Sequence, residues 1–278
     1  MVQQHVNDGP ERWLTGTSTG VRSALDMNDI RAAGLGAIEL TWQKMNMFDP
    51  EVKARCDAKI AAARAAGLEV WSVHIPYGTD WDPSCLDPEM RKDVIAKVKA
   101  VLAFAQEWGV RRAVYHPSWE PIASEDRARR LKTCKETLSV LAEESVKYGV
   151  QLAIECLPRT CLGNSADEME YLVGDEPALG ICCDVNHLFK ETPEQFIKRL
   201  GSRIVTTHIS DNDGNDEKHW LPGDGVIGWR AVLDALVQAG YGGTFMYEVR
   251  NPDPRVLADN WQALNKLYRG EGGPLLKG

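Results

Sequence analysis

The sequence lacks the features that mark membrane-spanning, secreted and disulfide-stabilised proteins. No apolar stretch approaches the roughly 18 residues of a membrane span, and no basic segment, apolar run and cleavage site open the chain. The seven cysteines include no Cys-x-x-Cys pair, which argues against structural zinc and a disulfide framework. We therefore expect a cytoplasmic protein without membrane contact, in which Cys156, Cys182 and Cys183 are small buried residues.

Positive charge is also scarce, and no basic patch stands out. The chain has 32 Lys and Arg residues against 40 Asp and Glu residues, which gives a net charge of −8. Its longest cationic groups, Arg111 with Arg112 and the stretch 127–135, are interrupted by acids or fall on an expected helix. Because binding to nucleic acid depends on Lys and Arg that neutralise phosphates, we expect no nucleic-acid partner. A homo-oligomer is compatible with the sequence.

What is present is a regular alternation of strand-like and helical segments. Short apolar runs rich in β-branched residues alternate with longer segments of helical spacing, which is typical of βα units with a parallel sheet. Eight strands are predicted, at Trp13–Ser18, Ala37–Trp42, Val70–Pro76, Ala113–Pro117, Gln151–Leu157, Gly180–Asp184, Ile204–Ile209 and Thr244–Val249. Eight such units in 278 residues predict an α/β fold, a single (β/α)₈ barrel, with an open doubly wound sheet as the alternative.

Helix boundaries are marked by capping residues. Ser165 with Glu168, and Thr192-Pro193 with Gln195, predict helix starts. Glycines that follow helical segments predict helix ends, at Gly34, Gly67, Gly109, Gly149, Gly201 and Gly240. We expect residues 1–278 to form one domain, with loosely ordered ends at 1–11 and 270–278.

Residues of metal-ligand type stand at the predicted C-terminal strand ends. They are His74, His116, Glu155, Asp184, His208 and Glu248. In a barrel these ends share one rim, so their side chains converge. A single residue of this kind has an ordinary structural explanation, but several carboxylates close together repel unless a cation lies between them. The set predicts a divalent metal, and suits manganese, cobalt, zinc or magnesium equally.

The order of these residues resembles the xylose-isomerase-like superfamily of sugar and sugar-phosphate isomerases and epimerases. The resemblance runs from Gly34 to Glu248 and rests on Glu155, Asp184-x-x-His187, His208 followed by Asp211, the segment HWLPGDGVIGW, and Glu248. It implies that Glu155, Asp184, His208 and Glu248 bind one divalent metal ion, and that His187 contacts the substrate.

The chemistry of these groups fits a sugar isomerase or epimerase. Moving a proton from a carbon beside a carbonyl needs a base near that carbon and an electrophile that stabilises the resulting enediolate. Glu155 and Glu248, about three strand positions apart, are the predicted catalytic residues, one removing the proton and the other returning it. The predicted contacts with a sugar, keto-sugar or sugar phosphate are His74, His116, His187, His219 and Trp119. Trp42 and Trp220 also occupy positions where a sugar face could pack.

Other functions remain open at this point. A dehydratase or lyase acting on a keto-sugar or keto-inositol would use the same site. The sequence also resembles the apurinic endonucleases of this superfamily, because it has enough ligands for a trinuclear zinc cluster: His74, His116, Glu155, Asp184, His187, His208, His219 and Glu248. The acid before His219 is either Asp216 or Glu217. A non-catalytic binding barrel would leave the carboxylates and imidazoles unexplained. Gly223, Gly225 and Gly228 could present N–H groups to a phosphate or form a tight turn.

Overall fold

The main architectural feature is a ring of eight parallel strands. The computed structural model describes residues 9–42, 45–250 and 253–271. The strands are β1 (Leu14–Gly20), β2 (Ala37–Thr41), β3 (Glu69–His74), β4 (Arg112–Tyr115), β5 (Gln151–Glu155), β6 (Leu179–Asp184), β7 (Ile204–His208) and β10 (Thr244–Tyr247), in the order β10-β1-β2-β3-β4-β5-β6-β7. The ring closes between β7 and β10, where the Ile209 N–H donates to Met246 O at 2.8 Å and the Glu248 N–H donates to Ile209 O at 3.0 Å. The predicted (β/α)₈ barrel is confirmed.

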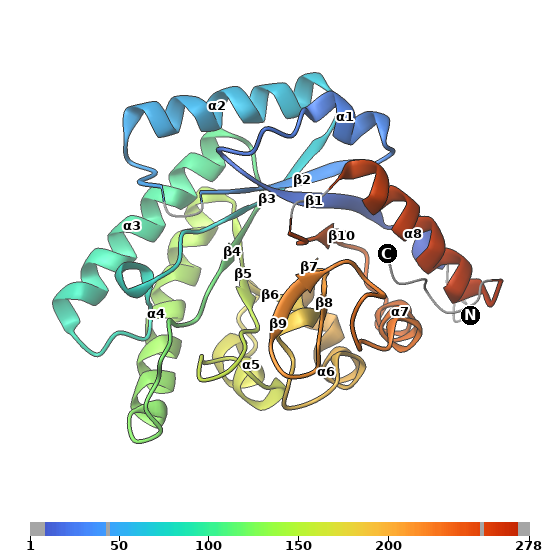
Figure 1. Cartoon of the computed structure of the whole chain (residues 1–278). Helices are drawn as coiled ribbons and strands as arrows, with labels where there is room; N and C mark the ends of the chain where they lie inside the picture. The colour runs from blue at the N-terminus through green and yellow to red at the C-terminus, as the bar shows by residue number, and fades with distance from the viewer. Residues whose placement is uncertain (1–8, 43–44, 251–252, 272–278) are drawn as a thin grey trace, which may run out of the picture.

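Helices surround the strands (Figure 1). They are α1 (Met27–Ala32), α2 (Pro50–Ala65), α3 (Pro88–Glu107), α4 (Arg127–Tyr148), α5 (Ala166–Val173), α6 (Pro193–Leu200), α7 (Trp229–Gln238) and α8 (Pro254–Arg269). Short 3₁₀ helices occur at η1 (Pro10–Arg12), η2 (Thr79–Trp81), η3 (Val185–His187) and η4 (Gly201–Arg203). The apolar stripes at helical spacing face the strands, as shown by buried Val94, Val98, Val101, Leu102 and Ala105 on α3.

Most of the predicted helix boundaries agree with the structure. The Ser165 side chain accepts from the Glu168 N–H, and Thr192 with Gln195 forms a capping box. Five of the six predicted end glycines have a positive φ, between 60° and 98°, which a residue without Cβ adopts readily. Gly201 also follows the end of its helix, α6, but its φ is −55° because the chain continues from α6 directly into η4.

The chain ends are partly outside the described residues. Of the predicted loose ends, residues 9–11 contribute to the turn of η1 and Gly270 caps α8 in a left-handed conformation. Residues 1–8 and 272–278, and with them His5, lie outside the described residues. None of the described helices is both long and apolar enough to cross a membrane.

The sequence analysis did not predict a β-hairpin on the rim. A short antiparallel hairpin, β8 (Asp211–Asn212) and β9 (Glu217–Trp220), follows β7 at the C-terminal rim. Its strands are short and polar, so neither carries the alternation of apolar residues that reveals a strand. The hairpin places Glu217 and His219 over the barrel mouth.

The core contains one residue that sequence reasoning considered for another role. Trp42, considered for sugar contact, is 1% exposed and stacks on Trp108 with ring centroids 5.8 Å apart. It therefore fills the layer between strands and helices. Cys156, Cys182 and Cys183 are buried free thiols, as predicted.

Candidate active site

Four predicted metal ligands meet at the centre of the rim. Glu155 ends β5, Asp184 ends β6, His208 ends β7 and Glu248 follows β10. One ligand atom from each lies within 4.8 Å of the ligand atoms of the other three. The side chains of Glu155, Asp184 and His208 are at most 1% exposed, whereas that of Glu248 is 25% exposed and faces the cavity. The barrel thus brings together groups that are up to 93 residues apart (248 minus 155) in the sequence.

The electrostatics of this group fit a bound cation. Burial, together with Glu248 and Glu155, raises the pKa of the Asp184 carboxyl well above its usual range. Asp184 Oδ2 is buried and accepts no hydrogen bond, although His187 Nδ1 lies 3.2 Å away. Burial also raises the pKa of Glu155, but His208 and His116 outweigh it and hold the pKa well below normal. A divalent ion would neutralise the carboxylates and give Asp184 Oδ2 a partner.

Two further groups of metal-ligand type flank this centre. His74 and His116 each direct Nε2 to Glu155 Oε2, at 3.1 and 3.0 Å, and the three form one group. On the other side, His187 Nε2 lies 2.7 Å from Glu217 Oε2, and His219 completes the second group. Asp216 instead pairs with Arg159 at 2.7 Å, so Glu217 is the acid that accompanies His219.

The sequence analysis did not identify a buried carboxylate that lies behind the four predicted metal ligands. Glu39, on β2, is fully buried and lies with Oε1 2.9 Å from His208 Nε2, while Ser72 donates to its Oε2 at 2.7 Å. A proton on His208 Nε2 satisfies Glu39 and leaves Nδ1 facing the other carboxylates, 3.0 Å from Glu155 Oε1. The only sign of Glu39 in the sequence was a single acidic residue within the apolar run of β2. Glu39 orients a candidate ligand as outer carboxylates commonly do.

Replacing Glu39 by glutamine is expected to weaken metal binding by about 10–100-fold, because loss of an outer carboxylate removes the charge that orients and polarises the ligating imidazole. Competition with a chelator of known affinity measures the change. The Ser72→Ala variant, which removes only the second hydrogen bond of Glu39, is the matched control and should have a smaller effect. Equal metal affinity in Glu39→Gln and the wild type would contradict this role.

The cavity above the centre has a volume of about 280 Å³ and a partly aromatic wall. Tyr77 stacks on His116 and on Trp119, with ring centroids 4.7 and 5.7 Å apart, and Trp119 is 36% exposed. His74, His116, His187, His219 and Trp119, the predicted substrate contacts, all line this cavity. Trp220 is 40% exposed but is not among the lining residues.

Two lining residues have an unusual backbone. Arg159 and His219 have φ values of 52° and 53°, in the left-handed region that side chains other than glycine rarely adopt. Arg159 pairs with Glu120, Asp216 and Glu217, and so links the β5 loop to the hairpin. The surrounding contacts hold this conformation, as is common at functional sites.

The glycine-rich loop before α7 binds a carboxylate of the chain itself. Asp211 accepts hydrogen bonds from the Gly223 N–H at 2.8 Å, the Ile227 N–H at 3.1 Å and Trp229 Nε1 at 2.8 Å. A Cβ at Gly225 would lie 2.1 Å from Asn212 O, so the loop closes only around glycine there. The hypothesis that Gly223, Gly225 and Gly228 present N–H groups to a substrate phosphate is corrected for Gly223, whose N–H is already used.

Comparison with known proteins finds relatives of low identity, some uncharacterised and some described as sugar epimerases. It is 29% identical over 188 residues to the uncharacterized protein MJ1311 of Methanocaldococcus jannaschii, a match that spans 64% of this chain and 64% of that relative. It is 22% identical over 223 residues to a fructoselysine 3-epimerase of Escherichia coli O157:H7, covering 77% of this chain and 81% of the relative.

Solved structures and a family model extend this result over the barrel. The crystal structure of a D-tagatose 3-epimerase-like protein superimposes with a TM-score of 0.80 at 24% identity, over 92% of this chain and 98% of that one, and shows the shared fold. The family model described as a xylose isomerase-like TIM barrel matches residues 27–267. The chain therefore belongs to the xylose isomerase-like TIM barrel family.

Proposed function

We propose that this chain is a metal-dependent isomerase or epimerase that acts on a sugar or keto-sugar by carboxylate-mediated proton transfer. The observation that carries the proposal is the group formed by Glu155, Asp184, His208 and Glu248, in which Glu155 and Glu248 line a cavity on the rim. Manganese, cobalt, zinc or magnesium suits these ligands. The fructoselysine 3-epimerase relative supports the same reaction class.

The positions of these residues support a distinct role for each. A divalent ion held by the four ligands would supply positive charge beside the substrate oxygens, where negative charge develops as a neighbouring C–H proton leaves. Glu155, kept ionised by His208 and His116, is one proton-transfer group, and Glu248 is the other because it faces the cavity. Tyr77 and Trp119 offer flat faces to the C–H surface of the sugar, while His187 and His219 offer hydrogen bonds.

A second candidate function is a multinuclear zinc phosphodiesterase, like the apurinic endonucleases. The specific observation in its favour is the pair of additional groups, His74 with His116 and Glu155, and His187 with Glu217 and His219. Against it stand the net charge of −8, which disfavours a polyanionic substrate, and the glycine-rich loop that already binds Asp211.

Metal stoichiometry and isotope exchange together test the proposal. We expect one catalytic ion per chain and deuterium incorporation from solvent at the carbon beside the carbonyl of a ketose. Identifying the product, with or without loss of water, then separates an epimerase from a dehydratase or lyase. A content near three zinc ions per chain, together with cleavage of an abasic duplex that His116→Ala abolishes, would overturn the proposal in favour of the phosphodiesterase.

A further inference from the structure

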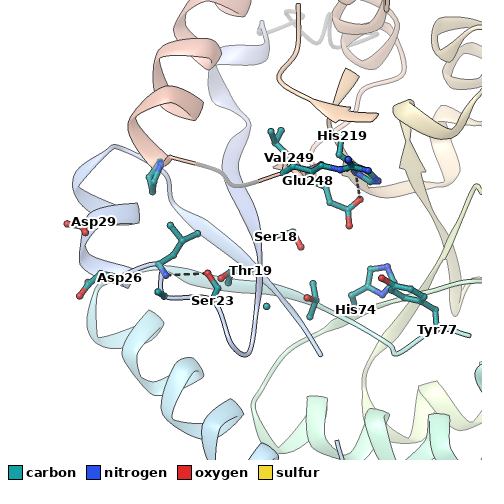
Figure 2. Close-up of a pocket in the computed structure, with 16 residues that line it drawn as sticks. Ser18, Thr19, Ser23, Asp26, Asp29, His74, Tyr77, His219, Glu248 and Val249 are labelled. Atoms are coloured by element: carbon teal, nitrogen blue, oxygen red, sulfur yellow. Dashed lines mark hydrogen bonds and ion pairs between the residues drawn. The ribbon is translucent and has the colours of Figure 1, made fainter. Parts of the chain in front are cut away.

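A second and larger cavity adjoins the metal centre. Its volume is about 820 Å³, against about 280 Å³ above the centre, and the two share His74, Tyr77, His219 and Glu248 in their walls. Figure 2 shows its lining: Asp26 and Asp29 lie at one side of the view, Ser23, Thr19 and Ser18 follow, and His74 and Tyr77 lie at the other side. A group attached to a sugar at the metal centre can therefore extend over the ends of β1 and β2 without leaving the site.

The middle of this cavity is lined by hydroxyl groups. Ser18, Ser23 and Thr41 all contribute. Thr19 also borders the cavity, but it pairs with Leu40 of the core between strands and helices, and its Oγ1 is a buried atom on that face of β1. Ser18 pairs with Glu39, which lies inside the barrel, so its hydroxyl is on the face of β1 that borders the cavity.

The outer wall of the cavity is held in place before any ligand binds. Lys59, on α2, donates from Nζ to Gly20 O and to Ser23 O, both at 2.8 Å. The Val21 N–H donates to Thr41 O at 2.9 Å, which fastens the end of β1 to β2. These contacts fix the segment that carries Ser18, Thr19 and Ser23, so a ligand would bind with little loss of loop entropy.

We propose that this cavity is a second subsite of the active site and takes a neutral polyhydroxylated unit, so that the substrate class is a ketose linked to a second sugar. This inference rests on the proposed function. Hydroxyl groups both donate and accept hydrogen bonds and so match sugar hydroxyls, while Leu25, Val249 and Pro254 supply apolar surface for C–H faces. Two carboxylates, Asp26 and Asp29, against one guanidinium, Arg250, disfavour a phosphate or carboxylate substituent.

Binding measurements on full-length protein supplied with Mn²⁺ test the subsite. D-fructose is compared by calorimetry with two fructose disaccharides that keep the keto group, isomaltulose and lactulose. We expect at least one disaccharide to bind about 10-fold or more tightly than fructose. Ser18→Ala should abolish that advantage and leave the affinity for fructose unchanged. Thr19→Val is the matched control, because the Thr19 hydroxyl is one residue away but buried on the other face of β1.

The outcomes separate this inference from the proposed function. Equal affinity for fructose and both disaccharides, or a disaccharide advantage that survives in Ser18→Ala, would overturn the subsite. Tighter binding of a fructosyl amino acid than of either disaccharide would also overturn it, because the occupant would then be charged. A disaccharide advantage that depends on Ser18 supports the subsite whether or not deuterium exchanges. Failure of the proposed function would show instead as absence of exchange from every ketose that binds.

Discussion

Glu155→Gln and Glu248→Gln should each lower turnover by at least about 100-fold while the barrel stays folded. General acid–base catalysis by a positioned side chain typically contributes about 10²–10⁴-fold, and each variant removes one proton-transfer group. The amide oxygen can still coordinate a cation, so we expect part of the metal to be retained. Turnover per metal-loaded site, measured on a ketose that shows deuterium exchange, is the quantity to compare.

Glu120→Gln provides the control for these two variants. Glu120 lines the same cavity and pairs with Arg159, but it belongs to none of the groups of metal-ligand type. Its replacement should change turnover by only a few-fold. Near-normal turnover in Glu155→Gln or Glu248→Gln would remove that residue from proton transfer and leave it as a metal ligand only.

Asp184→Asn is expected to weaken metal binding by more than about 100-fold, since even an outer-sphere partner contributes about 10–100-fold. The substitution keeps a side-chain oxygen for the Asn186 N–H, which now donates to Asp184 Oδ1 at 2.8 Å. Without metal, the variant should be as stable as the wild type or more so, because one buried charge beside Glu155 and Glu248 is gone. With metal, only the wild type should show a rise in Tm.

Glu168→Gln is the matched control for Asp184→Asn. Glu168 is also a largely buried carboxylate on the barrel rim, but its partner is Arg127, 2.7 Å away, and no group of metal-ligand type includes it. Metal content should be unchanged in this variant. A wild-type metal content in Asp184→Asn, measured on folded protein, would contradict the assignment of Asp184 as a ligand.

Much of the fold could be predicted because its signals are local and repeated. Each of the eight strands is a short apolar run between helical segments, and the structure places a strand at every predicted position. Glycine at a helix end was informative where the chain turns back, as at Gly149 with a φ of 64°. Gly201 also marks a helix end, although its φ of −55° belongs to the right-handed turn that begins η4.

The candidate site was predictable where the position of a residue along its strand determines which way its side chain points. Barrel topology alone brings Glu155, Asp184, His208 and Glu248 together, so their convergence follows from the strand assignment. Contacts made across the barrel were not predictable. Glu39 meets His208 from a strand 169 residues away in the sequence, and no spacing rule links the two. The choice of Glu217 over Asp216 depends on the turn of a hairpin whose strands carry no apolar alternation.

The hydroxyl groups of the second cavity and most of the metal ligands come from different parts of the chain. The ligand side chains stand at or next to the ends of β5, β6, β7 and β10, whereas Ser18 and Ser23 belong to β1 and the segment that follows it. Loops at this rim vary among barrels while the strands are maintained. Substitutions between residues 18 and 29 could therefore change which substrate is selected without altering the reaction. Descendants of such a barrel can diverge in specificity through one short segment while inheriting the same chemistry.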